Sequence, residues 1–360
     1  MAIIFIYKII IDKFFGACYS SKLYNNYWNN IMKIIMLTDH SSHTEYDSVY
    51  ALPKAISKYS NNITVYAASR AINAEHFLCK TPFIDCCIVD DGFCFENREQ
   101  YFNIKNTTKI QLSDFDVIFF RIDRPISDKY LKYCRKIASK SRYINTPEGL
   151  IRTGSKEFLV NFRDICPDFT IVKNLKEIEK LVDKYPIVLK PLGGYGGYGI
   201  IKIISFEEIY IGKDCIKGNK AKKYLHDLPI TYYPIMAMKY LKKVSQGDKR
   251  ILVVAGECLG AILRIPKQNS WLCNLAQGAT SAPSQLTKEE HYIVKRVDSV
   301  LNKEGINVYG IDTLVDDNGK RIMSEINTTN VGGFIQLQQT SDIDIMYKIV
   351  DLLFKRIMEV

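Results

Sequence analysis

Paired cysteine motifs are missing from this sequence, although 10 of its 360 residues are cysteine. Cys86 and Cys87 are adjacent and the other cysteines are far apart, so no Cys-x-x-Cys pair occurs. That spacing indicates neither a zinc site nor a redox motif. The sequence therefore predicts free thiols in a reducing cytoplasm rather than a disulfide scaffold.

Long runs of a single chemical character are missing as well. The apolar stretch at residues 2–11 contains Lys8 and is followed by Asp12 and Lys13. It is too short and too charged to span a membrane, and it lacks the small-residue cleavage site of a signal peptide. We therefore expect no membrane association, and we expect residues 1–31 to be an N-terminal extension that precedes the first strand, with Met32 as a possible natural start.

Positive charge is abundant but scattered. The formal net charge is +10, yet no sustained basic run occurs. An anionic ligand such as a nucleotide or a polycarboxylate accounts for this charge, whereas nucleic-acid binding would favour a basic patch or stripe. We therefore expect small-molecule partners and no nucleic acid.

Strand-like and helix-like segments alternate in the first part of the chain, which predicts an α/β fold. Short apolar runs at 34–37, 63–67 and 116–121 read as strands, and residues 49–59 have helical spacing. This alternation predicts an open, mainly parallel sheet over residues 32–145, with ligands at the carboxyl ends of its strands.

The rest of the chain, residues 146–360, predicts two further lobes that enclose a ligand. The expected central lobe covers about 146–241 and the expected C-terminal lobe about 242–360. Strands are expected at 185–191, 200–204, 233–241, 250–254, 258–264, 308–315 and 322–326, and helices at 155–162, 288–304 and 342–358.

A glycine-rich stretch, Gly194-Tyr195-Gly196-Gly197-Tyr198-Gly199, fits the pattern G-x-G-x-x-G. In a dinucleotide-binding fold a helix would follow, but here residues 200–204 are β-branched and strand-like. We therefore expect a hairpin whose backbone N–H groups cover phosphates, with Gly194, Gly196 and Gly197 as its contact points. A flexible tight turn without a ligand is the alternative.

Three further groups of residues fit the chemistry of joining a carboxylate to an amine through an acyl-phosphate. Lys156 and Lys190 provide point charges for phosphate oxygens. Asp312, Glu325 and Asn327 are oxygen donors on two adjacent strands and suit Mg²⁺, or Mn²⁺, bridging phosphates. Arg250 and Arg264 are expected as catalytic groups that clamp a carboxylate or the transferring phosphoryl group. Surface lysines, polar residues on an exposed sheet face and surface ion pairs remain the alternatives for these groups.

In their order along the chain, these features resemble the prokaryotic glutathione synthetase family of the ATP-grasp superfamily. The resemblance runs from about Met32 to the C-terminus. Its most specific part is residues 247–254, which read Gly-Asp-Lys-Arg-Ile-Leu-Val-Val. The segment at residues 116–123 and the segments around Lys156 and Lys190 also fit the family pattern.

The resemblance implies an ATP-grasp fold, ATP, Mg²⁺, and γ-glutamylcysteine and glycine as substrates, in an enzyme that is often a homo-oligomer. It implies that Met238, Lys239, Tyr240 and Leu241 form the interlobe hinge beside adenine. It also implies that Arg121, Asp123 and Asn145 lie on the substrate side. The order of the chain further suggests that Arg264 and Asn274, with the loop 330–333 that contains Gly332 and Gly333, enclose the acyl-phosphate and the incoming amine.

The chain departs from the family around the expected acceptor side. Leu272-Cys273 stand where an Arg-Gly pair is usual, and residues 328–333 replace a turn that contains Ser-Pro. These departures leave open another ATP-grasp ligase with a different amino acid or peptide substrate. A nucleotide-binding regulatory protein without turnover is a further alternative, which the presence of all three expected metal ligands disfavours.

Removal of residues 1–31 is expected to leave catalysis intact, because the first strand of the sheet begins after them. The measurement is ATP-dependent ADP release by a protein that begins at Met32, compared with the full chain. An insoluble or inactive product would show that the extension packs on the core.

Overall fold

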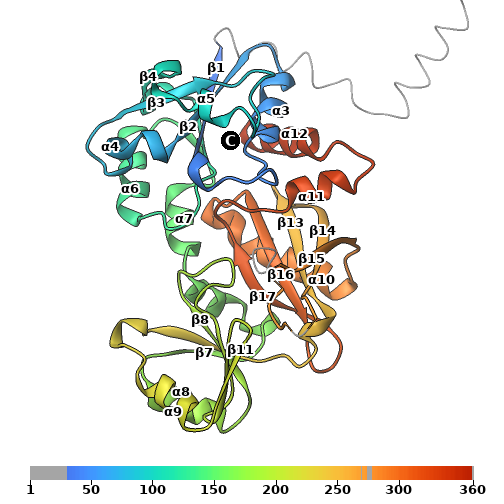
Figure 1. The fold of residues 1–360 in the computed structure, drawn as a ribbon. Coiled ribbons are helices and arrows are strands. Elements are labelled where there is room, and N and C mark those ends of the chain that lie inside the picture. The colour runs from blue at the N-terminus through green and yellow to red at the C-terminus, as the bar shows by residue number, and fades with distance from the viewer. Residues whose placement is uncertain (1–30, 269, 274–277, 359–360) are drawn as a thin grey trace, which may run out of the picture.

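The computed structural model describes residues 31–268, 270–273 and 278–358, with side chains to residue 356. Three sheets and their helices form three lobes, and the sheet built from the last part of the chain lies between the other two (Figure 1). The α/β class predicted from the sequence is confirmed. Within the described residues, no helix has the length and apolarity needed to cross a bilayer.

The first sheet has the strand order β4-β3-β2-β1-β5-β6. Strands β2, β1, β5 and β6 run parallel, while β3 and β4 are added antiparallel at one edge. The strands are β1 (Met32–Thr38), β2 (Ile63–Ser69), β3 (Phe83–Ile88), β4 (Thr108–Gln111), β5 (Val117–Phe120) and β6 (Arg142–Ile144). The helices are α3 (Ala51–Tyr59), α4 (Ala74–Phe77), α5 (Arg98–Tyr101), α6 (Asp128–Ile137) and α7 (Pro147–Thr153). The expected open, mainly parallel sheet is confirmed.

The second sheet is antiparallel, in the order β11-β10-β9-β8-β12-β7. Its strands are β7 (Phe169–Val172), β8 (Ile187–Pro191), β9 (Ile201–Ser205), β10 (Glu208–Ile211), β11 (Asp214–Lys217) and β12 (Ile235–Lys239), and α8 (Leu175–Val182) and α9 (Asn219–His226) accompany it. The glycine-rich stretch connects β8 to β9, which pair antiparallel. The expectation of a glycine hairpin instead of a strand-to-helix turn is therefore confirmed.

The third sheet is antiparallel as well, in the order β15-β14-β13-β16-β17. Its elements are β13 (Asp248–Val254), β14 (Glu257–Ile265), β15 (Thr280–Ser284), β16 (Val308–Val315), β17 (Arg321–Asn327), α10 (Lys288–Leu301), α11 (Phe334–Gln339) and α12 (Ile345–Met358). A bulge lies between β16 and β17. Asp312 is paired with Glu325 and Thr313 with Met323, so Ser324 is the extra residue.

Two helices differ from their predicted form. The helix expected at residues 155–162 is a series of 3₁₀ turns over Lys156–Ile165 with a kink at Phe162. Its buried residues, Leu159, Phe162 and Ile165, are spaced by three, which matches the three residues per turn of a 3₁₀ helix. The last helix was expected from residue 342 but begins at Ile345, after the separate short helix α11.

Helix α12 lies against α3 of the first lobe, far from it in sequence (Figure 1). The ring of Phe354 stacks on Tyr59, with 4.9 Å between the ring centroids. One buried apolar cluster includes Met36 and Ile56 of the first lobe together with Ile349 of α12. The last helix therefore completes the core of the first lobe.

Asn145 joins the first lobe to the third sheet. It is buried, and its Nδ2 donates to the carbonyl oxygens of Val308 and Thr328 at 2.7 and 2.8 Å. Its Oδ1 accepts from the amides of Asn307 and Val308 at 2.7 and 2.8 Å. The side chain is therefore the hydrogen-bond partner of four backbone groups, which lie at the start of β16 and just after the end of β17.

We predict that Asn145→Ala lowers the free energy of unfolding by about 2–5 kcal/mol, because buried backbone groups lose their partners. Chemical denaturation followed by circular dichroism measures the change. Asn161→Ala, which removes one hydrogen bond at an exposed residue, is the control and should change it by less than about 0.5 kcal/mol. Equal losses in the two variants would contradict the joining role of Asn145.

Candidate active site

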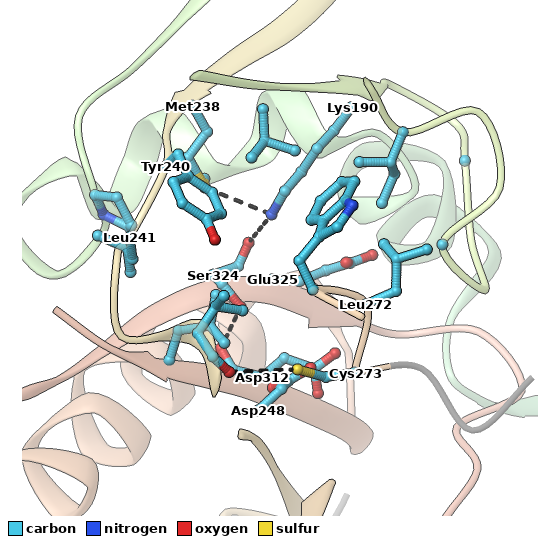
Figure 2. Close-up of a pocket in the computed structure, with 18 of the residues that line it drawn as sticks. Lys190, Met238, Tyr240, Leu241, Asp248, Leu272, Cys273, Asp312, Ser324 and Glu325 are labelled. Carbon is cyan, nitrogen blue, oxygen red and sulfur yellow. Dashed lines mark hydrogen bonds between the residues drawn. The ribbon is translucent and has the colours of Figure 1, made fainter. Parts of the chain in front are cut away.

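A pocket lies between the second and third sheets. Its walls contain apolar side chains at one end and charged side chains at the other (Figure 2). The residues that line it include Lys156, Val188, Lys190, Gly194, Gly197, Met238, Lys239, Tyr240, Leu241, Asp248, Trp271, Leu272, Asp312, Leu314, Ser324 and Glu325. Most residues expected to bind the nucleotide therefore meet in one cavity.

Lys190 extends from β8 across this pocket (Figure 2). Its Nζ lies 3.3 Å from the Ser324 carbonyl oxygen and 3.5 Å from Met238 Sδ. The bulge at Ser324 turns that carbonyl toward the lysine. Burial lowers the pKa of Lys190, and the nearby Glu325 carboxylate partly opposes that shift. An ammonium group with so few protein partners is suited to an anionic ligand.

Lys156 closes the same end of the pocket from the 3₁₀ segment. Its Nζ donates to the Gly194 carbonyl oxygen at 2.5 Å and to Glu325 Oε1 at 2.9 Å. Burial alone would raise the pKa of Glu325, but Lys156 and Lys190 outweigh burial and hold that pKa below its usual range. Glu325 is therefore an ionised carboxylate placed between two ammonium groups.

The glycine hairpin requires glycine at two of its expected contact points. Gly196 and Gly197 have φ values of 63° and 78°, a region that other residues rarely adopt. Tyr195 and Tyr198, on either side of this pair, are exposed, although both line the pocket. The hairpin therefore forms one border of the pocket.

The hinge segment forms the apolar end of the pocket. Met238 and Leu241 are buried and line the cavity together with Val188 and Leu314. The amides of Lys239 and Tyr240 donate to the carbonyl oxygens of Asp168 and Pro186, both at 2.8 Å. These bonds fix the segment, and Met238 and Leu241 form an apolar wall of the pocket.

Asp312 lies at the centre of the charged end. Arg250 donates to both of its oxygens through Nε and Nη2, and Arg264 Nη2 lies 3.0 Å from Oδ2. Asn327 Nδ2 also donates to Oδ2, at 3.2 Å. Burial by itself would raise the pKa of Asp312, but the two arginines hold it well below its usual range. Both arginines expected to clamp a substrate therefore hold this carboxylate in the structure.

Asp248 is a pocket residue that the sequence analysis did not select. It is the first residue of β13 and lies opposite Arg264 on β14, with which it forms an ion pair. Burial raises the pKa of Asp248 to about 6, with the Asp312 charge adding to burial and Arg264 opposing it. Its Oδ1 is buried without a hydrogen-bond partner among the described residues. Its position two residues before Arg250, on the same face of the strand, could have identified Asp248 from the sequence.

The oxygen atoms of Asp312, Glu325 and Asn327 fit a hard divalent cation. Among the residues that the structure describes, Asp312 Oδ1 accepts only from Arg250, whereas Oδ2 accepts from three groups, so Oδ1 has a lone pair to spare. Glu325 makes its hydrogen bond in the described part of the chain through Oε1, which leaves Oε2. No group of three His, Cys, Asp or Glu residues suited to a metal occurs in the described ranges. A cation here would therefore need phosphate oxygens to complete its ligands, as is usual for Mg²⁺.

The residues expected on the substrate side lie apart from the pocket. Arg121 is fully buried and donates from Nη2 to Ser48 Oγ and to the Val331 carbonyl oxygen, at 2.9 and 3.0 Å. Burial lowers the pKa of Arg121 to about 10. Arg121 thus supports the loop that leads to Gly332 and Gly333.

The other residues of this group show different surroundings. Asp123 accepts from Ser42 Oγ at 2.7 Å and from Asn330 Nδ2. All side-chain hydrogen-bonding atoms of Asn145 contact backbone, as described above. Asn274 lies outside the described residues. Contact of these residues with a substrate stays a prediction.

Comparison with known proteins agrees with this arrangement. Residues 155–342 match the ATP-grasp domain of prokaryotic glutathione synthetase, and residues 32–150 match its N-terminal domain. A glutathione synthetase of Agrobacterium fabrum is 29% identical over 263 residues, which cover 72% of this chain and 78% of the relative. One of Prochlorococcus marinus subsp. pastoris is 26% identical over 260 residues, covering 70% and 79%.

Solved structures share the fold. The D-cycloserine synthetase DcsG has a TM-score of 0.61 at 12% identity, covering 90% of this chain and 99% of that one. The macrocyclase MdnC from Microcystis aeruginosa, bound to its precursor peptide MdnA, has a TM-score of 0.56 at 18% identity, covering 89% and 99%. With models of two family domains matched along most of its length, the chain belongs to the prokaryotic glutathione synthetase family and is an ATP-grasp ligase that forms a carbon–nitrogen bond.

Proposed function

We propose that this ligase joins γ-glutamylcysteine to glycine through an acyl-phosphate, with ADP and phosphate as the other products. The observation that carries the proposal is the meeting of Lys156 and Lys190 with Asp312 and Glu325 in one pocket, where Asn327 donates a hydrogen bond to Asp312. The relatives named glutathione synthetase support the choice of substrates.

Different residues of the pocket would bind the nucleotide and neutralise its charge. The apolar wall at Met238 and Leu241 would hold the base, and Lys156, Lys190 and the glycine hairpin would hold the phosphates. Asp312, Glu325 and Asn327 would hold Mg²⁺, which supplies neutralisation of phosphate charge when it is bound. Manganese fits the same oxygen donors.

Arg250 and Arg264 would act where negative charge develops during the transfer. In the structure both bind Asp312, so they are already oriented by a carboxylate. Their remaining N–H groups would stabilise the transferring phosphoryl group or the acyl-phosphate carboxylate. The loop at Gly332 and Gly333, together with Asn274, would enclose the amine.

Product analysis tests the proposed substrates. The protein is incubated with ATP, Mg²⁺ and each of a panel of γ-glutamyl dipeptides, other dipeptides and amino acids, and products are identified by mass spectrometry. Glutathione from γ-glutamylcysteine and glycine is the expected product. ADP release with a different pair, and none with this one, would leave an ATP-grasp ligase with another substrate, as the departures near Leu272 and Thr328 would allow.

Lys190→Ala and Lys156→Ala are each expected to weaken ATP binding about ten- to a hundredfold, because each removes a charge-assisted contact to phosphate. Isothermal titration calorimetry measures the affinity, and thermal unfolding verifies the fold. Lys176→Ala changes an exposed lysine on α8 and should bind ATP like the parent protein. Unchanged ATP affinity in both pocket variants would show that Lys156 and Lys190 do not bind the nucleotide.

Glu325→Gln is expected to abolish turnover with little change in melting temperature, because the carboxylate serves a cation and not the apolar core. ADP release is followed over a range of Mg²⁺ concentrations. Glu45→Gln, at an exposed position of the first lobe, is the control. Near-normal turnover of Glu325→Gln at limiting Mg²⁺ would contradict the metal assignment.

A bulky residue in the loop before α11 is expected to raise the KM for glycine at least about tenfold and to leave ATP affinity unchanged, because the side chain would fill the space for the amine. Gly332→Leu is the better variant, since no atom lies within 4 Å of a Cβ placed there. At Gly333, where φ is 114°, any side chain would also strain the backbone. A normal KM for glycine in Gly332→Leu would place the amine elsewhere.

A further inference from the structure

A second cavity, of about 280 Å³, lies beside the nucleotide pocket. It is bounded by the loop that follows β5, by α6 and α7, and by the segment just after β17. Its size is close to the lower end of ligand pockets, roughly 300 Å³. Arg124, Asp128, Ser155 and Thr329 give it polar groups, and Ile126 and Leu150 give it an apolar side.

Arg124 brings a positive charge that the protein does not neutralise locally. Its Nη1 donates to the Gly154 carbonyl oxygen, and its Nη2 lies 3.4 Å from Thr329 Oγ1. No carboxylate of the described residues forms an ion pair with it. Burial lowers the pKa of Arg124, against the attraction of the more distant Glu325. A half-buried guanidinium without a carboxylate partner is costly to retain and suits a ligand that carries one.

Asp128 supplies the opposite charge at the same cavity. It is the first residue of α6 and is exposed. The helix does not need it as a cap, because Ser127 Oγ already accepts from the Tyr130 amide. Within the described ranges, Asp128 takes part in no ion pair. The cavity therefore presents one free cation and one free carboxylate to a ligand.

The cavity adjoins the reacting end of the nucleotide pocket. Two of its lining residues, Ser155 and Gly193, precede Lys156 and Gly194, which line the nucleotide pocket and bind each other. The Lys156 amide also donates to the Leu192 carbonyl oxygen at 2.9 Å. A molecule whose carboxylate reaches the phosphate end can therefore place its far end in the second cavity.

We propose that this cavity binds the α-amino acid head group of the donor substrate, with Arg124 taking its α-carboxylate and Asp128 its α-ammonium. The inference rests on the proposed function. A γ-glutamyl group is joined through its side-chain carboxyl, so its α-carboxylate and α-ammonium both remain free. They lie at the end of the dipeptide opposite the cysteine carboxylate that reacts.

Donor analogues that lack one charge test this assignment. 4-Aminobutanoylcysteine lacks the α-carboxylate, and glutarylcysteine lacks the α-ammonium. For the parent protein, kcat/KM is expected to fall about 10- to 100-fold with each analogue relative to γ-glutamylcysteine, because a charge-assisted contact is lost.

Each variant should lose the preference for γ-glutamylcysteine over one of the two analogues. Arg124→Ala should use γ-glutamylcysteine and 4-aminobutanoylcysteine about equally while still rejecting glutarylcysteine. Asp128→Asn should show the reverse pattern. Arg142→Ala, at an exposed arginine on β6, is the control and should discriminate like the parent protein. A general structural defect would lower all three activities together and would not remove a single preference.

Binding of γ-glutamylcysteine, measured by calorimetry with a non-hydrolysable ATP analogue, separates the two proposals. Glutathione formation with both preferences intact in Arg124→Ala and Asp128→Asn would overturn the head-group site and leave the proposed function standing. If the parent protein neither bound nor turned over γ-glutamylcysteine, both proposals would be overturned.

Discussion

The ion pairs around Asp312 fix the geometry on which the site depends. Its carboxylate lies on β16 and is held by Arg250 of the neighbouring β13 and by Arg264 of β14. One buried charge therefore aligns three strands at the edge that faces the pocket between the second and third sheets. Removal of a single partner from such a cluster leaves an uncompensated buried charge, so the cluster holds only as a unit. Glu325, directly opposite Asp312 on β17, lies outside this cluster and forms a separate ion pair with Lys156 of the preceding lobe.

The strand that carries Arg250, β13, has charged side chains on both of its faces. Side chains alternate along a strand, so Asp248 and Arg250 face the site while Lys249 points to the opposite side. There the buried Lys249 Nζ lies 2.7 Å from Glu290 Oε2, and Glu290 Oε1 accepts from Thr313 Oγ1 at 2.6 Å. The same glutamate caps α10 with Thr287. The three consecutive charged residues 248–250 therefore have two roles. Lys249 joins the sheet to α10, and Asp248 and Arg250 contribute charged side chains to the site.

Much of the site could be predicted because strand ends and alternation place side chains reliably. The strand after the glycine loop excluded a dinucleotide fold, and Lys190 at the end of β8 could be expected beside that loop. The bulge at Ser324, the ion pairs of Asp248 and the burial of Arg121 depend on contacts between distant segments. No local pattern of residues carries that information. Likewise, the sequence placed a helix near residue 342 but gave no sign that it packs on α3.

The placement of α12 has a consequence for how the polypeptide acquires its structure. The first lobe lacks part of its apolar core until residues 345–354 are in place, because Ile349 and Phe354 cover side chains of β1 and α3. During synthesis, this lobe is therefore completed only after α12 has left the ribosome, although its own strands are made before those of the other two sheets. Its uncovered face stays exposed for most of translation, a period in which a chaperone has a defined apolar surface to bind.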